Sequence, residues 1–156
     1  MIIMYPIIKP LPIKTKNKPL LKKIWIWLTI TRQWILVEDF YIRIPGSFKK
    51  IFIPKGFIFD GVSIPRIFWT ILNPIGILFL GAIPHDFGYK YEGLFYKANN
   101  IFYFKKHTRK ELDQIFYKIN EENNKLKLIT KISLYILRLF GWIAWNNHRK
   151  ENKSWK

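Results

Sequence analysis

The hydrophobic pattern of this chain changes its period near residue 77, and that change constrains the fold more than any other feature. Before it, short segments rich in aromatic and β-branched residues predict strands at Trp25–Ile30, Trp34–Val37, Phe40–Ile44 and Ile51–Ile53. After it, apolar residues recur at helical spacing. The sequence therefore indicates an α+β fold, with a small N-terminal antiparallel β-sheet packed on a mainly α core of three helices.

Two of the three expected helices have recognisable starts or ends. The first contains His85, and Pro84 either starts this helix or kinks it. The second opens at a capping box, with Thr108 as the N-cap and Glu111 three residues later, and its apolar residues then follow helical spacing. The adjacent asparagines that finish at Asn124 end this helix.

The remaining segments are interpreted as a connection, a last helix and two basic ends. Residues 93–107 are aromatic and basic and are expected to connect two helices, whereas residues 126–145 are apolar on most faces and are expected to lie largely within the core. We divide the chain into an extended basic proline-rich arm (1–22), a single α+β domain (23–147) and a basic tail (148–156). The arm is expected to become ordered only when it binds something.

Charge and cysteine content exclude several classes of site. The chain has 27 Lys and Arg against 10 Asp and Glu, a net charge of +17, and no cysteine. Without cysteine there is no disulfide framework, thiolate metal site or cysteine nucleophile. The positive charge favours an anionic partner, which is nucleic acid, an anionic phospholipid membrane or an acidic protein. A coding bias toward lysine and isoleucine codons is the alternative explanation.

No segment is predicted to span a membrane or to act as a secretion signal. Residues 67–84 are free of charge and nearly long enough to span, but Pro74 and Gly76 indicate a buried loop that leads into a core helix. Residues 132–145 are too short to span and contain Arg138. Prolines occupy the N-terminus, where a signal peptide would need an apolar helix.

The residues that could perform chemistry begin with His85. His85 and Tyr89 are four residues apart and share a helix face. A carboxylate from another helix would let the imidazole act as a general base, and Asp113 is the best candidate because it lies at the edge of an apolar stripe. Tyr89 is placed to donate its hydroxyl to the same carboxylate.

A cation site is suggested by a second set of residues. Asp86 points about a quarter turn away from His85, so the two neighbours face different tasks. Its carboxylate is suited to a hard cation, together with oxygens of the loop at Asp60 and Gly61. Each of these features alone is more often structural, since an Asp-Gly pair usually marks a turn.

The joint order of the motifs is similar to the signature of a phage-associated domain of unknown function. The motifs are Ile53–Arg66, His85–Tyr89, Arg109–Phe116 and Leu137–Trp142, and the resemblance covers about Trp34–Trp145. The resemblance implies a bacteriophage protein that is located in the virion or in the cytoplasm of the host bacterium.

The order of the motifs also resembles, more distantly, the prokaryotic phospholipase A2 group. This resemblance implies that His85 activates a water that attacks an ester, that Asp113 orients the imidazole, and that Tyr89 supports the pair. It also implies a phospholipase A2-like arrangement of the three-helix core.

Calcium is the cofactor that the phospholipase resemblance implies. Asp86 and Asp60 would hold Ca²⁺ together with backbone carbonyls near Gly61, and the cation would stabilise the oxyanion. The chain departs from the group in having no disulfides and in the long aromatic insertion of residues 91–107.

Three functions follow from these observations. The first is calcium-dependent hydrolysis of a lipid ester during infection or lysis. The alternative is a non-enzymatic structural or accessory virion component of a portal, tail or cargo, which uses its basic surface and residues 1–22 to bind other virion proteins or DNA. The third is nucleic-acid binding by the lysines and aromatic residues of segment 90–106, although an aromatic loop packed on its own core is the favoured explanation of that segment.

Overall fold

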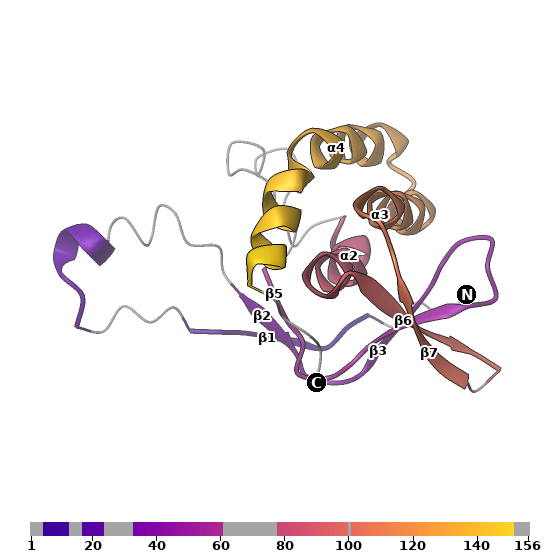
Figure 1. Cartoon of the computed structure of the whole chain (residues 1–156), viewed down its shortest axis with the longest axis horizontal. Coiled ribbons are helices and arrows are strands. Elements are labelled where there is room, and N and C mark those ends of the chain that lie inside the picture. The colour runs from indigo at the N-terminus through magenta and orange to yellow at the C-terminus, as the bar shows by residue number, and fades with distance from the viewer. Residues whose placement is uncertain (1–4, 13–16, 24–32, 61–77, 100, 152–156) are drawn as a thin grey trace.

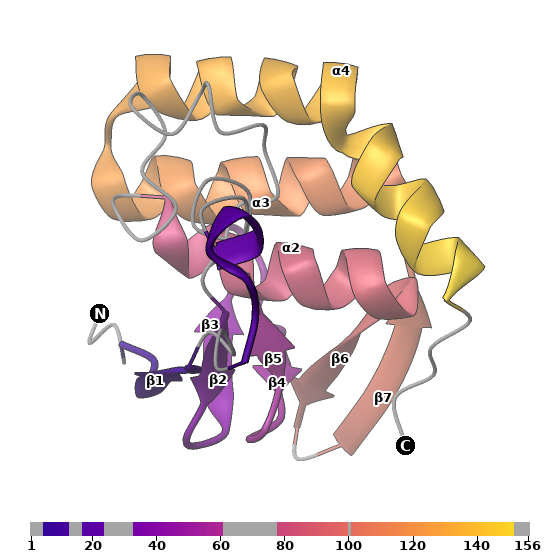
Figure 2. The same ribbon diagram turned by 90° about the vertical axis from the view of Figure 1, so that its left-hand side faces the viewer.

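The structure is a computed structural model in which helices are stacked over strands (Figures 1 and 2). It describes residues 5–12, 17–23, 33–60, 78–99 and 101–151. The strand expected at Trp25–Ile30, the motif residues after Asp60 and the expected cation ligand Gly61 lie outside this part of the chain. The α+β fold class predicted from the sequence is confirmed.

The strands form two antiparallel sheets. The first has the order β1-β2-β5 and consists of β1 (Ile8–Pro10), β2 (Trp34–Leu36) and β5 (Ile58–Phe59). The second has the order β3-β4-β6-β7 and consists of β3 (Phe40–Arg43), β4 (Lys50–Ile53), β6 (Gly93–Ala98) and β7 (Ile101–Lys106). Because β1 pairs with β2, part of the N-terminal arm is held by the chain itself, where we expected order only against a partner.

The expectation that residues 93–107 form a simple connection is wrong, because they form the hairpin β6–β7. Leu94 and Tyr96 point into the core, whereas Phe102 and Phe104 on the outer strand are exposed. The segment is therefore a hairpin that packs on the core through its inner strand and leaves part of its outer strand exposed. Alternation between the two faces of a strand explains this pattern, and it was hidden in the sequence because aromatic residues occupy both faces.

After a short helical turn at residues 20–23, three longer helices follow in the expected order: α2 (Phe79–Tyr91), α3 (Arg109–Asn124) and α4 (Lys127–Lys150). The capping box is confirmed, since the Thr108 backbone N–H donates to Glu111 Oε2 at 2.7 Å and the Glu111 N–H donates to Thr108 Oγ1 at 3.3 Å. Helix α3 ends at Asn124 as predicted, and Pro84 lies inside α2 rather than at its start.

Two glycines let α2 and α3 approach each other closely. A Cβ atom at Gly81 would lie 2.2 Å from the side-chain nitrogen of Asn120, and one at Gly88 would lie 2.3 Å from Leu112. The Gly81 N–H also donates to Asn120 Oδ1 at 3.2 Å. His85 lies midway between the two glycines on the same helix face, so the close approach presses its ring against α3.

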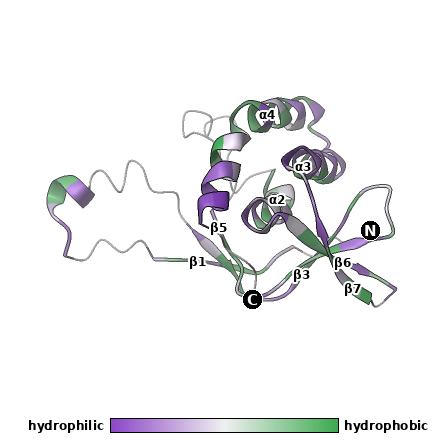
Figure 3. Cartoon of the chain, viewed as in Figure 1, coloured by the Kyte–Doolittle hydropathy of each residue, from purple (hydrophilic) through white to green (hydrophobic). Residues whose placement is uncertain are grey.

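Helix α4 is much more exposed than we expected from its apolar sequence. Leu128 is 72% exposed and Leu139 is 65% exposed, whereas Leu137 is only 2% exposed. Figure 3 shows hydrophobic and hydrophilic residues mixed along this helix. By length and composition alone α4 could cross a membrane, a property that core helices of soluble proteins share, and the absence of a spanning segment stays a prediction.

Candidate functional site

The structure brings His85 of α2 and Asp113 of α3 into direct contact. The Nε2 atom of His85 lies 3.0 Å from Asp113 Oδ1. Both side chains are inside the protein, since His85 is 3% exposed and Asp113 is 0% exposed. The structure therefore brings the two side chains proposed from the sequence within hydrogen-bond distance, and their catalytic role stays a prediction.

Tyr89 completes the arrangement one helical turn after His85. Its hydroxyl donates to the same Asp113 oxygen at 2.6 Å, and its ring centroid lies 4.0 Å from that of His85. Trp145 packs edge-on against the Tyr89 ring at 5.4 Å. Gly141 leaves the space for the hydroxyl, because a Cβ there would lie 2.5 Å from it. Helix α4 thus helps to fix the position of the Tyr89 side chain through Trp145 and Gly141.

Two arginines that we did not identify from the sequence neutralise the other side of Asp113. Arg109 Nη1 lies 3.7 Å from Asp113 Oδ2, and Arg138 Nε lies 3.6 Å from it. Each arginine also binds backbone on the facing helix: Arg109 donates to the Leu137 carbonyl at 3.1 Å, and Arg138 donates to the Lys110 carbonyl at 2.9 Å. The four-residue spacing of Arg109 and Asp113 was a signal that could have found the first of them.

This environment moves the pKa values of the pair in opposite directions. Burial acts to raise the pKa of Asp113, but the hydrogen bonds from His85 and Tyr89 and the charge of Arg138 outweigh it and hold the pKa below 3.8. Burial acts to lower the pKa of His85, but contact with the carboxylates of Asp113 and Asp86 raises it above 6.5. The pair therefore favours an ionised Asp113 beside a His85 that accepts protons readily.

Burial also decides the role of the third group. Burial and the charge of Asp113 raise the pKa of Tyr89, so its hydroxyl keeps its proton and acts as a donor. The Asp113 carboxylate consequently accepts two hydrogen bonds on one oxygen and faces two guanidinium groups with the other.

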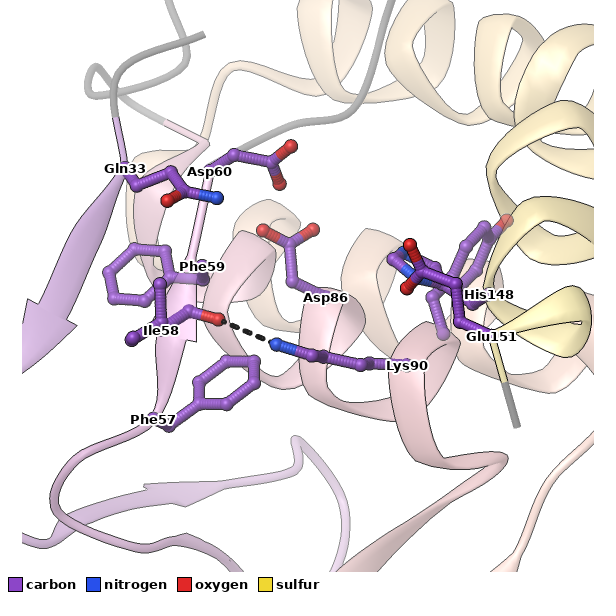
Figure 4. A pocket seen from close by; sticks show the side chains of 10 residues that line it. Gln33, Phe57, Ile58, Phe59, Asp60, Asp86, Lys90, His148 and Glu151 are labelled. Atoms are coloured by element: carbon purple, nitrogen blue, oxygen red, sulfur yellow. Dashed lines mark hydrogen bonds and ion pairs between the residues drawn. The ribbon is translucent and has the colours of Figure 1, made fainter. Parts of the chain in front are cut away.

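Asp86 connects the buried pair to a pocket. Its Oδ1 atom lies 3.9 Å from His85 Nδ1, the ring nitrogen that does not contact Asp113. The pocket beside it has a volume of about 170 Å³ and is shown in Figure 4. Its polar lining consists mainly of Asp60, Asp86, Tyr89, Lys90, His148 and Glu151.

The carboxylates of Asp60 and Asp86 fit a hard cation in their chemistry. Both line the pocket and are labelled in Figure 4. Within the ranges that the structure describes, no group of three or more histidine, cysteine or acidic side chains is arranged to hold a metal ion. The ammonium of Lys90 also lines this pocket and donates to the Ile58 carbonyl at 3.4 Å. Further ligands from the described residues would therefore be carbonyls, amides or water.

Comparison with known proteins identifies a family and no individual relative. A family described as "Protein of unknown function (DUF1353)" matches residues 34–136, which is well over half of the chain. No curated protein and no solved structure matches this chain. The matched range includes α2 and α3 and therefore both members of the buried pair.

Proposed function

Since the chain belongs to the DUF1353 family, whose function is unknown, we propose a function from the site: an ester hydrolase in which His85 is the general base. The observation that supports this proposal is the 3.0 Å contact between His85 Nε2 and Asp113 Oδ1, with Tyr89 on the same oxygen. The likeness of the motif order to prokaryotic phospholipase A2 favours a phospholipid as the substrate, and the likeness to phage-associated domains favours a bacteriophage source.

The proton transfers follow from the hydrogen bonds of the imidazole. Asp113 Oδ1 accepts a hydrogen bond from Nε2–H of His85, which favours the tautomer whose Nδ1 lone pair is available as a base. As the oxygen of a water bonds to the ester carbonyl carbon, its proton moves to His85 Nδ1. The tetrahedral intermediate then breaks its bond to the alcohol oxygen, and the same proton passes to that leaving oxygen.

Calcium is proposed as the electrophile of this reaction. Asp60 and Asp86, which line the pocket, are the residues that would hold it, and Asp86 Oδ1 lies 3.9 Å from His85 Nδ1. When bound, the cation would act as a Lewis acid toward the developing oxyanion. Asp86 would in that case lose part of its influence on the imidazole, so calcium and protons would compete for the site.

Fatty-acid release from vesicles that contain phosphatidylglycerol tests the proposal. We expect release with Ca²⁺ and none with a chelator, and we expect His85→Gln to lower the rate by about 10²–10⁴-fold. His107→Gln is the matched control, because His107 is also buried but contacts Tyr96 instead, at 2.8 Å. Full activity in the His85→Gln protein would overturn the assignment.

A second candidate function is favoured by the burial of His85. Its ring is enclosed by those of Tyr89 and Phe116, with centroids 4.0 and 5.4 Å away, an arrangement that also suits a purely structural ion-pair network. In that case the protein would be a basic accessory component that binds virion proteins or DNA. The protein would co-purify with intact particles and the His85→Gln protein would do so equally. Absence from purified particles would count against this candidate.

A further inference from the structure

The exposed side of α4 carries a continuous apolar stripe. Five of its residues recur at alternating spacings of four and three, and the sixth, Ile143, follows Leu139 by four, which places all six on one helix face. We call this set the apolar stripe: Leu128, Ile132, Tyr135, Leu139, Trp142 and Ile143, each exposed. Contiguous exposed apolar surface of this kind marks a binding surface rather than ordinary surface variation.

A basic edge borders the stripe on one side. Lys127 and Lys131 each directly precede a stripe residue, so each is rotated by about 100° to the same side of it. Lys127 and Lys131 are exposed, and α4 contains no acidic residue along its 24 residues. A surface that covers the stripe would therefore meet positive charge along its border.

The opposite side of α4 is fixed to the protein. Arg138 binds the Lys110 carbonyl of α3, and the Arg149 guanidinium donates to the Tyr89 carbonyl of α2 and pairs with Glu92 at 2.9 Å. Ser133 and Gly141 are buried on this side. These contacts hold the helix along the body of the protein, so its stripe can lie on a surface without the helix crossing it.

Charge decides what covers the stripe. A second copy of this chain would bring its own basic edge and a net charge of +17 toward the same charges, which opposes self-association. An anionic phospholipid bilayer instead offers an apolar interior to the leucines and phosphates to the lysines, and tryptophan and tyrosine favour the interface between these two layers.

We propose that the apolar stripe of α4 and its basic edge form the surface that binds this protein to anionic phospholipid bilayers, with α4 lying in the plane of the interface. Residues 128–143, which carry the stripe, would present about 24 Å of helix to the lipid at 1.5 Å per residue, and the end of α4 beyond them turns toward α2 (Figure 2). This inference gives the proposed hydrolase its lipid contact but rests on α4 alone, so it stands or falls independently of His85.

Co-sedimentation with vesicles tests the apolar part of the surface. The full chain should bind vesicles of phosphatidylglycerol and phosphatidylcholine, and Leu139→Glu and Trp142→Glu should each weaken the binding by at least about tenfold. Phe48→Glu is the matched control, since Phe48 is 95% exposed away from α4 and should leave binding unchanged. The mutated side chains are exposed, and unchanged thermal melts would establish that the variants fold.

A pair of double variants tests the basic edge at constant net charge. Lys127→Glu with Lys131→Glu should lower binding about tenfold or more, while Lys22→Glu with Lys23→Glu, also at exposed lysines, should change it less than threefold. Equal binding to vesicles of phosphatidylcholine alone would overturn the proposal. So would equal loss in both double variants, or a dimer that forms through α4 in place of vesicle binding.

The two proposals fail in different ways. The His85→Gln protein should bind vesicles like the wild type while releasing no fatty acid, and the Leu139→Glu protein should hydrolyse a soluble monomeric ester while binding vesicles poorly. Binding without any hydrolysis in the wild type would reject the hydrolase and retain the α4 surface. Hydrolysis that is equally fast in the Leu139→Glu protein on vesicles would reject the α4 surface.

Discussion

His85 lies 3.0 Å from Asp113, although 28 positions separate the two residues in the sequence. The contact arises because Gly81 and Gly88 let α2 approach α3 closely at both ends of the turn that carries the imidazole. The capped start of α3 then sets which residue of that helix meets the ring. A pair of this kind is thus a product of helix packing, and its chemistry can be tested separately from its position.

The pKa of His85 should fall when Asp113 loses its charge. In Asp113→Asn the hydrogen-bonded carboxylate is replaced by an amide, while the burial that lowers the pKa remains. NMR titration of the His85 ring protons should therefore give a lower pKa than in the wild type. The His148 resonances serve as an internal control, because His148 lies in α4 and pairs with Glu151. An unchanged or higher pKa for His85 would contradict the assigned network.

The stability of the protein should have a maximum near pH 6.5 from its buried histidines. The pKa of His85 is raised in the folded state, so its contribution is complete below the unfolded value of 6.5 and is lost as pH rises through the folded pKa. The pKa of His107 is lowered by burial, so stability is lost as pH falls from 6.5 toward the folded pKa. The free energy of unfolding in guanidinium chloride, measured across this range, checks both directions.

Single variants separate the two slopes. His85→Gln should flatten the decline above pH 6.5 and leave the acid side unchanged, and His107→Gln should flatten the acid side only. A decline above pH 6.5 that persists in the His85→Gln protein would show that another group causes it.

Adding one methyl group at Gly141 should destabilise the protein by about 1–3 kcal/mol. The new Cβ of Gly141→Ala would lie 2.5 Å from the Tyr89 hydroxyl and would push it away from Asp113. A double-mutant cycle with Tyr89→Phe checks this cause, because the same substitution should cost less once the hydroxyl is gone. An equal loss of stability from Gly141→Ala in the wild type and in the Tyr89→Phe protein would show that the clash with the Tyr89 hydroxyl is not the cause.

Two neighbouring leucines of α4 should respond very differently to truncation. Leu137→Ala should lower the free energy of unfolding by about 2–5 kcal/mol, because the side chain is buried in the core between the helices. Leu139→Ala should change it by less than about 0.5 kcal/mol, because that side chain belongs to the exposed stripe. Chemical denaturation of the two variants measures the difference, and similar losses would mean that α4 is covered on both sides.

The sequence predicted secondary structure well where residues close together in the chain determine it. The Thr108–Glu111 capping box fixes the start of α3, and the helical spacing after it is unambiguous. The pairing of His85 with Asp113 could also be anticipated, because a carboxylate at the edge of the buried apolar face of α3 needs a partner. Their mutual distance could not, since it depends on how closely two helices pack.

Other features depend on tertiary contacts that no local pattern reports. The strands β6 and β7 have aromatic residues on both faces, so their alternation does not appear as a change between apolar and polar residues. Arg138 meets Asp113 only because α4 folds back along α3. The exposure of the apolar stripe was not predicted either. An apolar helix is normally interpreted as a core helix, and only a partner outside the chain explains apolar residues on an exposed face.

Side chains from three helices converge on the one carboxylate of Asp113: His85 and Tyr89 from α2, Arg109 from α3 itself, and Arg138 from α4. If any one of these helices detached, a charge in the protein interior would lose part of its compensation, and that cost would resist partial opening. The three helices are thereby coupled into a single cooperative unit, whose backbone amides should exchange with solvent deuterium together rather than helix by helix.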